Sequence, residues 1–134
     1  MKIRKLSYRH NAIKLWVECV EPISMTLYDQ IDMLKDDLKG LTGIFQIRTR
    51  RRILKAIATR RRRVDHLVAI KGAISSGSKF KTALYLIKEE IALINEDPTS
   101  MKILSDTGEE KLVDLEKLAE LRDIIESLHK MKAQ

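Results

Sequence analysis

Hydrophobic residues recur every three or four positions along most of the chain, which is the spacing of one face of an α-helix. The pattern predicts helices over about 7–20, 27–41, 44–74 (or 49–74) and 78–94, and a final helix after residue 106. The recurring residues are Leu6, His10, Ile13, Val17 and Val20; Leu27, Ile31, Leu34, Leu38 and Leu41; Ile53, Ile57, Val64 and Val68; Phe80, Leu84, Ile87, Ile91 and Ile94; and Leu112, Leu115, Leu118, Leu121, Ile125 and Leu128. Long amphipathic helices joined by short loops are typical of a bundle. We therefore expect an all-α, four- to five-helix bundle with one long arginine-rich helix, and a single domain over residues 1–134.

Helix boundaries follow from residues that end or cap helices. Pro22 is expected to end the first helix, because the residue before a proline disfavours helical geometry. Ser24 or Thr26 is expected to cap the second helix and Gly40 and Gly43 to end it. The loop 75–78 is expected to end the third helix, with Ser78 capping the fourth.

The segment between the fourth and last helices has two interpretations. Asp97 followed by Pro98 predicts a short helix as far as Leu104, and residues 106–109 match a capping box for the last helix. A β-hairpin from Lys102 to Val113 is the alternative.

Composition narrows the class of protein. The chain has 134 residues and 15.5 kDa, with 44% hydrophobic and 34% charged residues, which fits one ordinary domain and excludes a disordered chain. We expect no signal peptide and no membrane insertion, and hence an intracellular or virion location. The lone Cys19 is expected to be a small buried hydrophobic residue.

Candidate catalytic and metal-binding patterns are incomplete. The segment 72–79 resembles a phosphate-binding loop, but its lysine and serine stand in the wrong order and no strand precedes it. A single Glu126/His129 pair does not make a di-metal site, which needs two such motifs. His10 is expected in the core or at its boundary, and acidic pairs such as Glu89/Glu90 on solvated faces. We therefore expect no enzyme, catalytic residue, cofactor, metal or small-molecule substrate.

Charge is distributed unevenly along the chain. Between Arg48 and Lys81 there are twelve basic residues and one acidic residue, for a net charge of +11, whereas residues 82–134 carry −5 and residues 1–47 carry +1. This asymmetry indicates a polyanionic partner, charge-complementary self-assembly, or both.

A helical wheel places six cations of the basic segment on one arc of about 120°. This predicted ridge comprises Arg48, Arg51, Arg52, Lys55, Arg62 and Arg63. Arg50, Arg60 and Arg61 fall outside it and must flank the core or reach a second partner. Lys79 and Lys81, with the serines before the fourth helix, are expected to hold one further backbone phosphate. Arginine forks suit phosphate, so the eight residues are predicted to bind nucleic acid.

The predicted binding is tolerant of sequence, because stacking aromatics and adenine-reading amides are nearly absent from the basic helix. Duplex is the expected partner, with DNA and RNA both open. A helix-turn-helix formed by the second and third helices is a further option. The alternative is a solvated arginine face paired internally with Asp32, Asp36, Asp37 or the last helix.

Two functional classes follow from these features: a small nucleic-acid-binding module, such as a regulator, and a subunit that forms a homo-oligomer or polymer. In its length, its Arg48–Arg63 helix and its leucine-rich C-terminal helix from Asp106 to Met131, the whole chain resembles the helical-bundle major coat proteins of large tailed, spindle-shaped archaeal viruses. That resemblance implies a self-assembling virion subunit. The chain also resembles the small helical subunits of CRISPR effector complexes, which line a nucleic-acid groove.

Overall fold

The computed structural model describes residues 2–97, 102–104 and 109–133. It confirms the all-α bundle and adds one short β-hairpin. The elements are α1 (Lys2–Leu15), a π-helical turn (Trp16–Val20), α2 (Glu21–Lys39), a 3₁₀ turn (Ile44–Gln46), α3 (Ile47–Ser76), α4 (Phe80–Glu96), β1 (Lys102–Leu104), β2 (Glu110–Leu112) and α5 (Leu115–Ala133).

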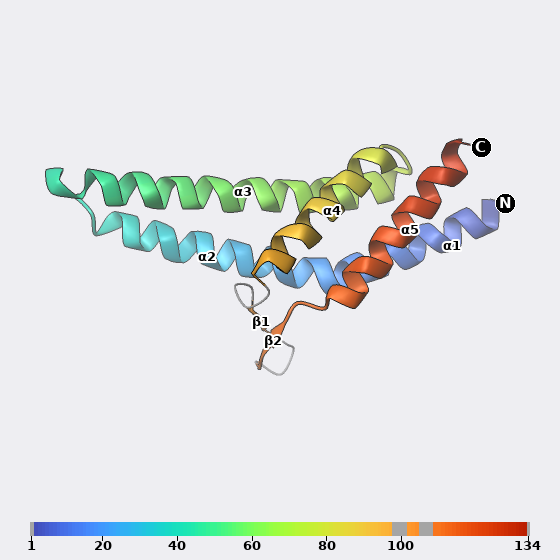
Figure 1. The fold of residues 1–134 in the computed structure, drawn as a ribbon, viewed down its shortest axis with the longest axis horizontal. Coiled ribbons are helices and arrows are strands. Elements are labelled where there is room, and N and C mark those ends of the chain that lie inside the picture. Colours follow the sequence, from blue (N-terminus) through green and yellow to red (C-terminus); the bar gives the residue numbers. More distant parts are fainter. Residues whose placement is uncertain (1, 98–101, 105–108, 134) are drawn as a thin grey trace.

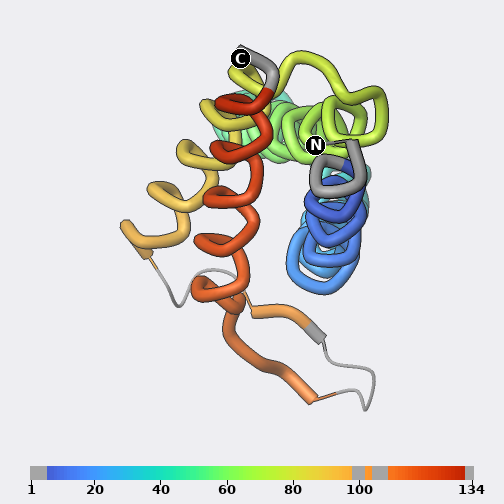
Figure 2. Tube along the Cα trace, turned by 90° about the vertical axis from the view of Figure 1, so that its right-hand side faces the viewer, coloured from blue at the N-terminus to red at the C-terminus, as the bar shows by residue number. Residues whose placement is uncertain are grey.

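The helices form two unequal regions (Figure 1). At one end, α1, α4, α5 and the C-terminal half of α3 surround the core, and α5 lies between α4 and α1 (Figure 2). At the other end, α2 and α3 continue as an antiparallel hairpin, which we call the arm and on which no other described helix packs (Figure 1). At 1.5 Å per residue the 30-residue α3 is about 45 Å long, so the arm extends well beyond the core.

Pro22 does not end the first helix, which contradicts the sequence-based expectation. The chain runs from α1 through the π-helical turn into α2, and the backbone N–H of Glu21 donates to the carbonyl of Trp16. Pro22 then occupies the first turn of α2, where its missing N–H leaves few bonds unmade. The expected caps are also wrong, because Ser24 is buried inside α2 and the Thr26 hydroxyl donates to the carbonyl of Pro22 at 2.9 Å.

The buried face of this long helix differs from the predicted one. Leu6, His10 and Val17 are exposed, so the expectation that His10 lies in the core or at its boundary is wrong. The buried side chains are Ala12, Leu15, Trp16, Cys19 and Val20. Two of them are small, which hid this face from a search for large hydrophobic residues. The Trp16 indole N–H donates to the carbonyl of Leu67 at 3.0 Å, which fixes the π-helical turn against α3.

The end of α3 is closed by a glycine and an arginine. Gly77 has φ of 69°, a left-handed conformation that suits glycine, and its N–H donates to the carbonyls of Ala73 and Ile74. Arg9 of α1 donates from Nε to the carbonyl of Ile74 at 3.0 Å, which places a cation at the negative end of the helix dipole. Ser78 is not the cap of α4, because its hydroxyl pairs with that of Ser76 at 2.8 Å and Lys79 occupies the cap position.

The segment before α5 forms the alternative β-hairpin. β1 and β2 pair antiparallel, with Ile103 opposite Lys111, so the predicted helix reaching Leu104 is wrong. Pro98 and the predicted capping box at 106–109 lie outside the described residues, apart from Glu109. α5 begins at Leu115, and the Asp114 carboxylate accepts from the N–H of Lys117 at 3.1 Å in place of the predicted cap.

Cys19 is buried as expected, and its environment makes it unreactive. Burial, together with the nearby Asp114 carboxylate, raises the pKa of the thiol from 9.0 to about 12. Thiolate is the reactive form, so at pH 8 iodoacetamide should modify the folded protein about 10³-fold more slowly than the urea-unfolded chain. Mass spectrometry of quenched samples measures both rates. Equal rates would contradict this burial.

Candidate nucleic-acid interface

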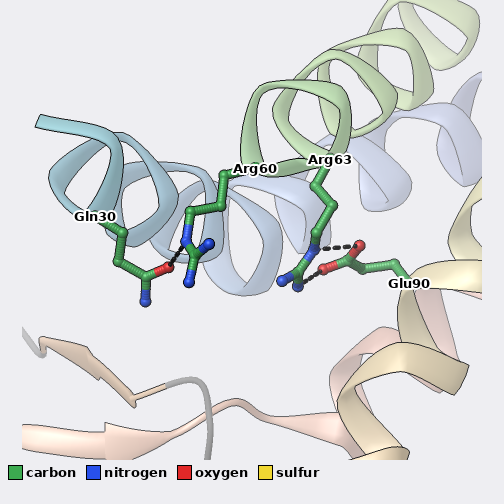
Figure 3. A network of polar contacts seen from close by, with 4 residues as sticks. All are labelled: Gln30, Arg60, Arg63 and Glu90. Atoms are coloured by element: carbon green, nitrogen blue, oxygen red, sulfur yellow. Dashed lines mark hydrogen bonds and ion pairs between the residues drawn. The ribbon is translucent and has the colours of Figure 1, made fainter. Parts of the chain in front are cut away.

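Arg63, the last cation of the predicted ridge, is paired with a buried acidic residue. Arg63 of α3 forms an ion pair with Glu90 of α4 through Nη2 and Oε1, and its Nε donates to Oε2 at 3.3 Å (Figure 3). Glu90 is 3% exposed, so it does not lie on a solvated face as expected. Its spacing of three from Ile87 and four from Ile94 places it on the apolar stripe of α4, and this spacing is the sequence signal that identifies it.

A second arginine joins the two helices of the arm. Arg60 donates from Nε to the side-chain oxygen of Gln30 in α2 at 2.8 Å, and from Nη1 to the carbonyl of Ala56 at 3.2 Å (Figure 3). Arg60 therefore flanks the core, which is one of the two roles expected for arginines outside the predicted ridge.

The other five cations of the predicted ridge are exposed and share one face of α3. This set, the exposed ridge, comprises Arg48, Arg51, Arg52, Lys55 and Arg62. None of them makes an ion pair or side-chain hydrogen bond with any other described residue. The alternative of internal pairing has no support in the described part of the chain, where Asp36 pairs with Lys39 at 3.7 Å instead.

From Arg48 to Arg62 the exposed ridge extends about 21 Å along the helix axis. Its five cations fall within an arc of about 100°. The strands of duplex nucleic acid carry one charge per about 1.7 Å of axis, so a ridge of this length lies alongside many phosphates. The geometry matches an extended polyanion better than a small anion.

Arg50 and Arg61 occupy a different exposed face of α3. They lie about 140° around the helix from the middle of the exposed ridge, beside the half-exposed side chains of Ile47, Leu54 and Val68. Val68 was expected to be buried with Ile57 and Val64, but the helices that pack on α3 approach from another side and bury Leu67, Ile70 and Ile74. α3 therefore presents a buried face, the exposed ridge and a mixed face of apolar and cationic residues.

Lys79 and Lys81 lie apart from the exposed ridge. Both are at the start of α4, beyond the opposite end of α3, more than about 20 Å along the helix axis from Arg62. A cavity of about 490 Å³ adjoins Lys79 and is lined mainly by small side chains from Ala69 to Ala83. The structure thus brings five of the eight predicted residues together.

Other kinds of site lack support in the described residues. No three His, Cys, Asp or Glu side chains among them gather closely enough to hold a metal ion. No helix in the described ranges combines the length and apolar character that crossing a membrane requires. Comparison of the chain with protein-family models, curated proteins and solved structures gives no match.

The pairing of Arg63 with Glu90 predicts that replacing Arg63 destabilises the fold, whereas replacing an exposed arginine of α3 does not. Arg63→Ala leaves a buried carboxylate without its cation, and should lower the free energy of unfolding by about 3 kcal/mol. Arg62→Ala, the adjacent control, should change it by less than about 0.5 kcal/mol. Urea denaturation followed by circular dichroism measures both.

A double variant separates the ion pair from simple packing. Arg63→Leu with Glu90→Leu removes both charges, so it should regain most of the stability that Arg63→Ala loses. If Arg63→Ala were as stable as Arg62→Ala, the buried pair would not contribute to folding.

Proposed function

We propose that this protein binds duplex nucleic acid, with little sequence preference, through the exposed ridge of α3. The observation that carries the proposal is the set of five cations on one helix face, without a counter-anion among the described residues. Like charges one turn apart on a helix repel each other and destabilise the helix. No described acidic residue offsets this repulsion, so a bound external anion would stabilise α3.

The chemistry of the exposed ridge favours phosphate contacts. Four of its five cations are arginines, whose planar guanidinium forks bind phosphate oxygens in pairs, whereas lysine supplies a point charge. Amide side chains that read adenine and aromatic side chains that stack on bases are absent from the ridge itself. Phosphate contacts fix position and affinity but carry little sequence information.

The ridge can be tested by neutralisation. Replacing Arg48, Arg51, Arg52 and Arg62 with glutamine should leave the helical circular dichroism unchanged and weaken binding of a random-sequence duplex at least 100-fold at low salt, an order-of-magnitude expectation. The slope of log K against log salt should become shallower by about 0.9 for each phosphate that the variant no longer neutralises. Fluorescence anisotropy over a salt series measures both quantities.

Lys79→Gln with Lys81→Gln provides the control, because these lysines are also exposed but lie beyond the far end of α3. We expect a change in affinity of less than about threefold, since these lysines are expected to hold one further phosphate at most. Unchanged binding after the ridge is neutralised would overturn the proposal. Loss of binding only in the lysine variant would move the site to the start of α4.

Self-association is a second candidate, favoured by large apolar side chains that the fold leaves exposed. They include Met25, Tyr28 and Met33 on α2, Ile44 and Phe45 at the tip of the arm, and Leu54 on α3. Contiguous exposed apolar surface marks interaction sites. We propose that the two activities belong together in a nucleic-acid-binding structural subunit of the virion-coat type, as the sequence resemblance implies.

A further inference from the structure

The outer side of α2 carries acidic and apolar residues on one exposed face. Six residues fall within an arc of about 140°, opposite the buried Ile23, Leu27 and Ile31. This acidic face comprises Met25, Tyr28, Asp29, Asp32, Met33 and Asp36. Asp29 and Asp32 make no ion pair or hydrogen bond through their side chains with any other described residue.

The mixed face of α3 has the complementary composition. Ile47, Arg50, Leu54 and Arg61 lie within an arc of about 60°, and this set is the mixed strip. Leu54 is 49% exposed and Met33, on the acidic face, is 68% exposed. Each surface therefore offers large apolar side chains beside charges of one predominant sign, positive on the mixed strip and negative on the acidic face.

The two surfaces also match in length. From Met25 to Asp36 the acidic face extends about 17 Å, and from Ile47 to Arg61 the mixed strip extends about 21 Å. The acidic face lies on the side of α2 opposite its buried residues, and the mixed strip lies on α3. The acidic face therefore cannot contact the mixed strip of the same copy. A second copy of this chain supplies both the apolar surface and the missing carboxylates.

We infer that copies of this protein associate side by side, with the acidic face of α2 in one copy packed on the mixed strip of α3 in the next. The inference rests on the self-association proposed above and names its surfaces. Because the two surfaces differ, the contact is heterologous, and an open row of copies keeps one surface of each kind free at its ends for a further neighbour. The exposed ridge stays outside the contact.

Charge reversal on either side tests this contact. Arg50→Glu with Arg61→Glu removes the cations of the mixed strip, and Asp29→Lys with Asp36→Lys reverses the acidic face. All four residues are exposed, so the circular dichroism of both variants should match that of the unaltered protein. Sedimentation velocity over a concentration series at low salt should show association of the unaltered protein, and at least about tenfold weaker association of each variant alone.

Mixing the two variants gives the decisive result. The acidic face of the first variant and the mixed strip of the second are both unaltered, so the equimolar mixture should associate again. If each variant associates weakly alone and the mixture associates strongly, α2 of one copy must contact α3 of another. A mixture that remains monomeric would overturn the inference, as would an unaltered protein that is monomeric at every concentration.

Arg48→Glu with Arg52→Glu is the matched control, because it makes the same charge change on the same helix but on the exposed ridge. Its association should stay within about twofold of the unaltered protein while its affinity for duplex falls. If the unaltered protein associates and neither the mixed-strip variant nor the acidic-face variant weakens association, the protein self-associates through other surfaces and the inference fails. If Arg50→Glu with Arg61→Glu weakens duplex binding and leaves association unchanged, the mixed strip serves nucleic acid and the inference fails.

Discussion

The buried ion pair between Arg63 and Glu90 joins α4 to α3 at the point that divides α3 into a half covered by α4 and a half that is not. A carboxylate that is 3% exposed is costly unless a cation accompanies it, and Arg63 provides one with two hydrogen bonds. On the C-terminal side of Arg63, α3 is covered by α4 and buries Leu67, Ile70 and Ile74. On the N-terminal side, α2 is the one described helix that packs on it.

The arm is a consequence of this division. Two helices that pack only on each other bury one seam, so the remaining faces of α3 must contact solvent or a partner. Arg60 of α3 joins the two helices through its hydrogen bond to Gln30 of α2. The arginines nearer the start of α3 form no ion pair with a described acidic residue of α2. The same geometry exposes Phe45 fully at the turn between the helices. The packing of α4 on one half of α3 therefore leaves the charged and apolar side chains of the arm exposed.

Sequence reasoning predicted the elements whose determinants are local. The length of α3, its end near Gly77 and the all-α class follow from periodicity and from the residues that end helices. The passage through Pro22 was missed because a π-helical turn depends on Trp16 being held against α3, which is a tertiary contact. Arg63 was placed with the exposed cations because a helical wheel does not show from which side α4 approaches. Its partner Glu90 was visible in the stripe of α4, but only as an acid at an apolar position.

The separation of α3 into three faces lets the two proposed activities reinforce each other. A contact through the mixed strip leaves the exposed ridge of every copy uncovered, so a row of copies carries repeated ridges along one side. Once one ridge has bound a duplex, its neighbour meets the same molecule at high effective concentration, and a modest affinity per copy becomes a large one for the row. Phosphate contacts suit such repetition because they do not depend on base sequence, so successive copies can bind at any register. If both proposals hold, α3 has a physical reason to keep its arginines on separate faces, with one set for the polyanion and another for the next copy.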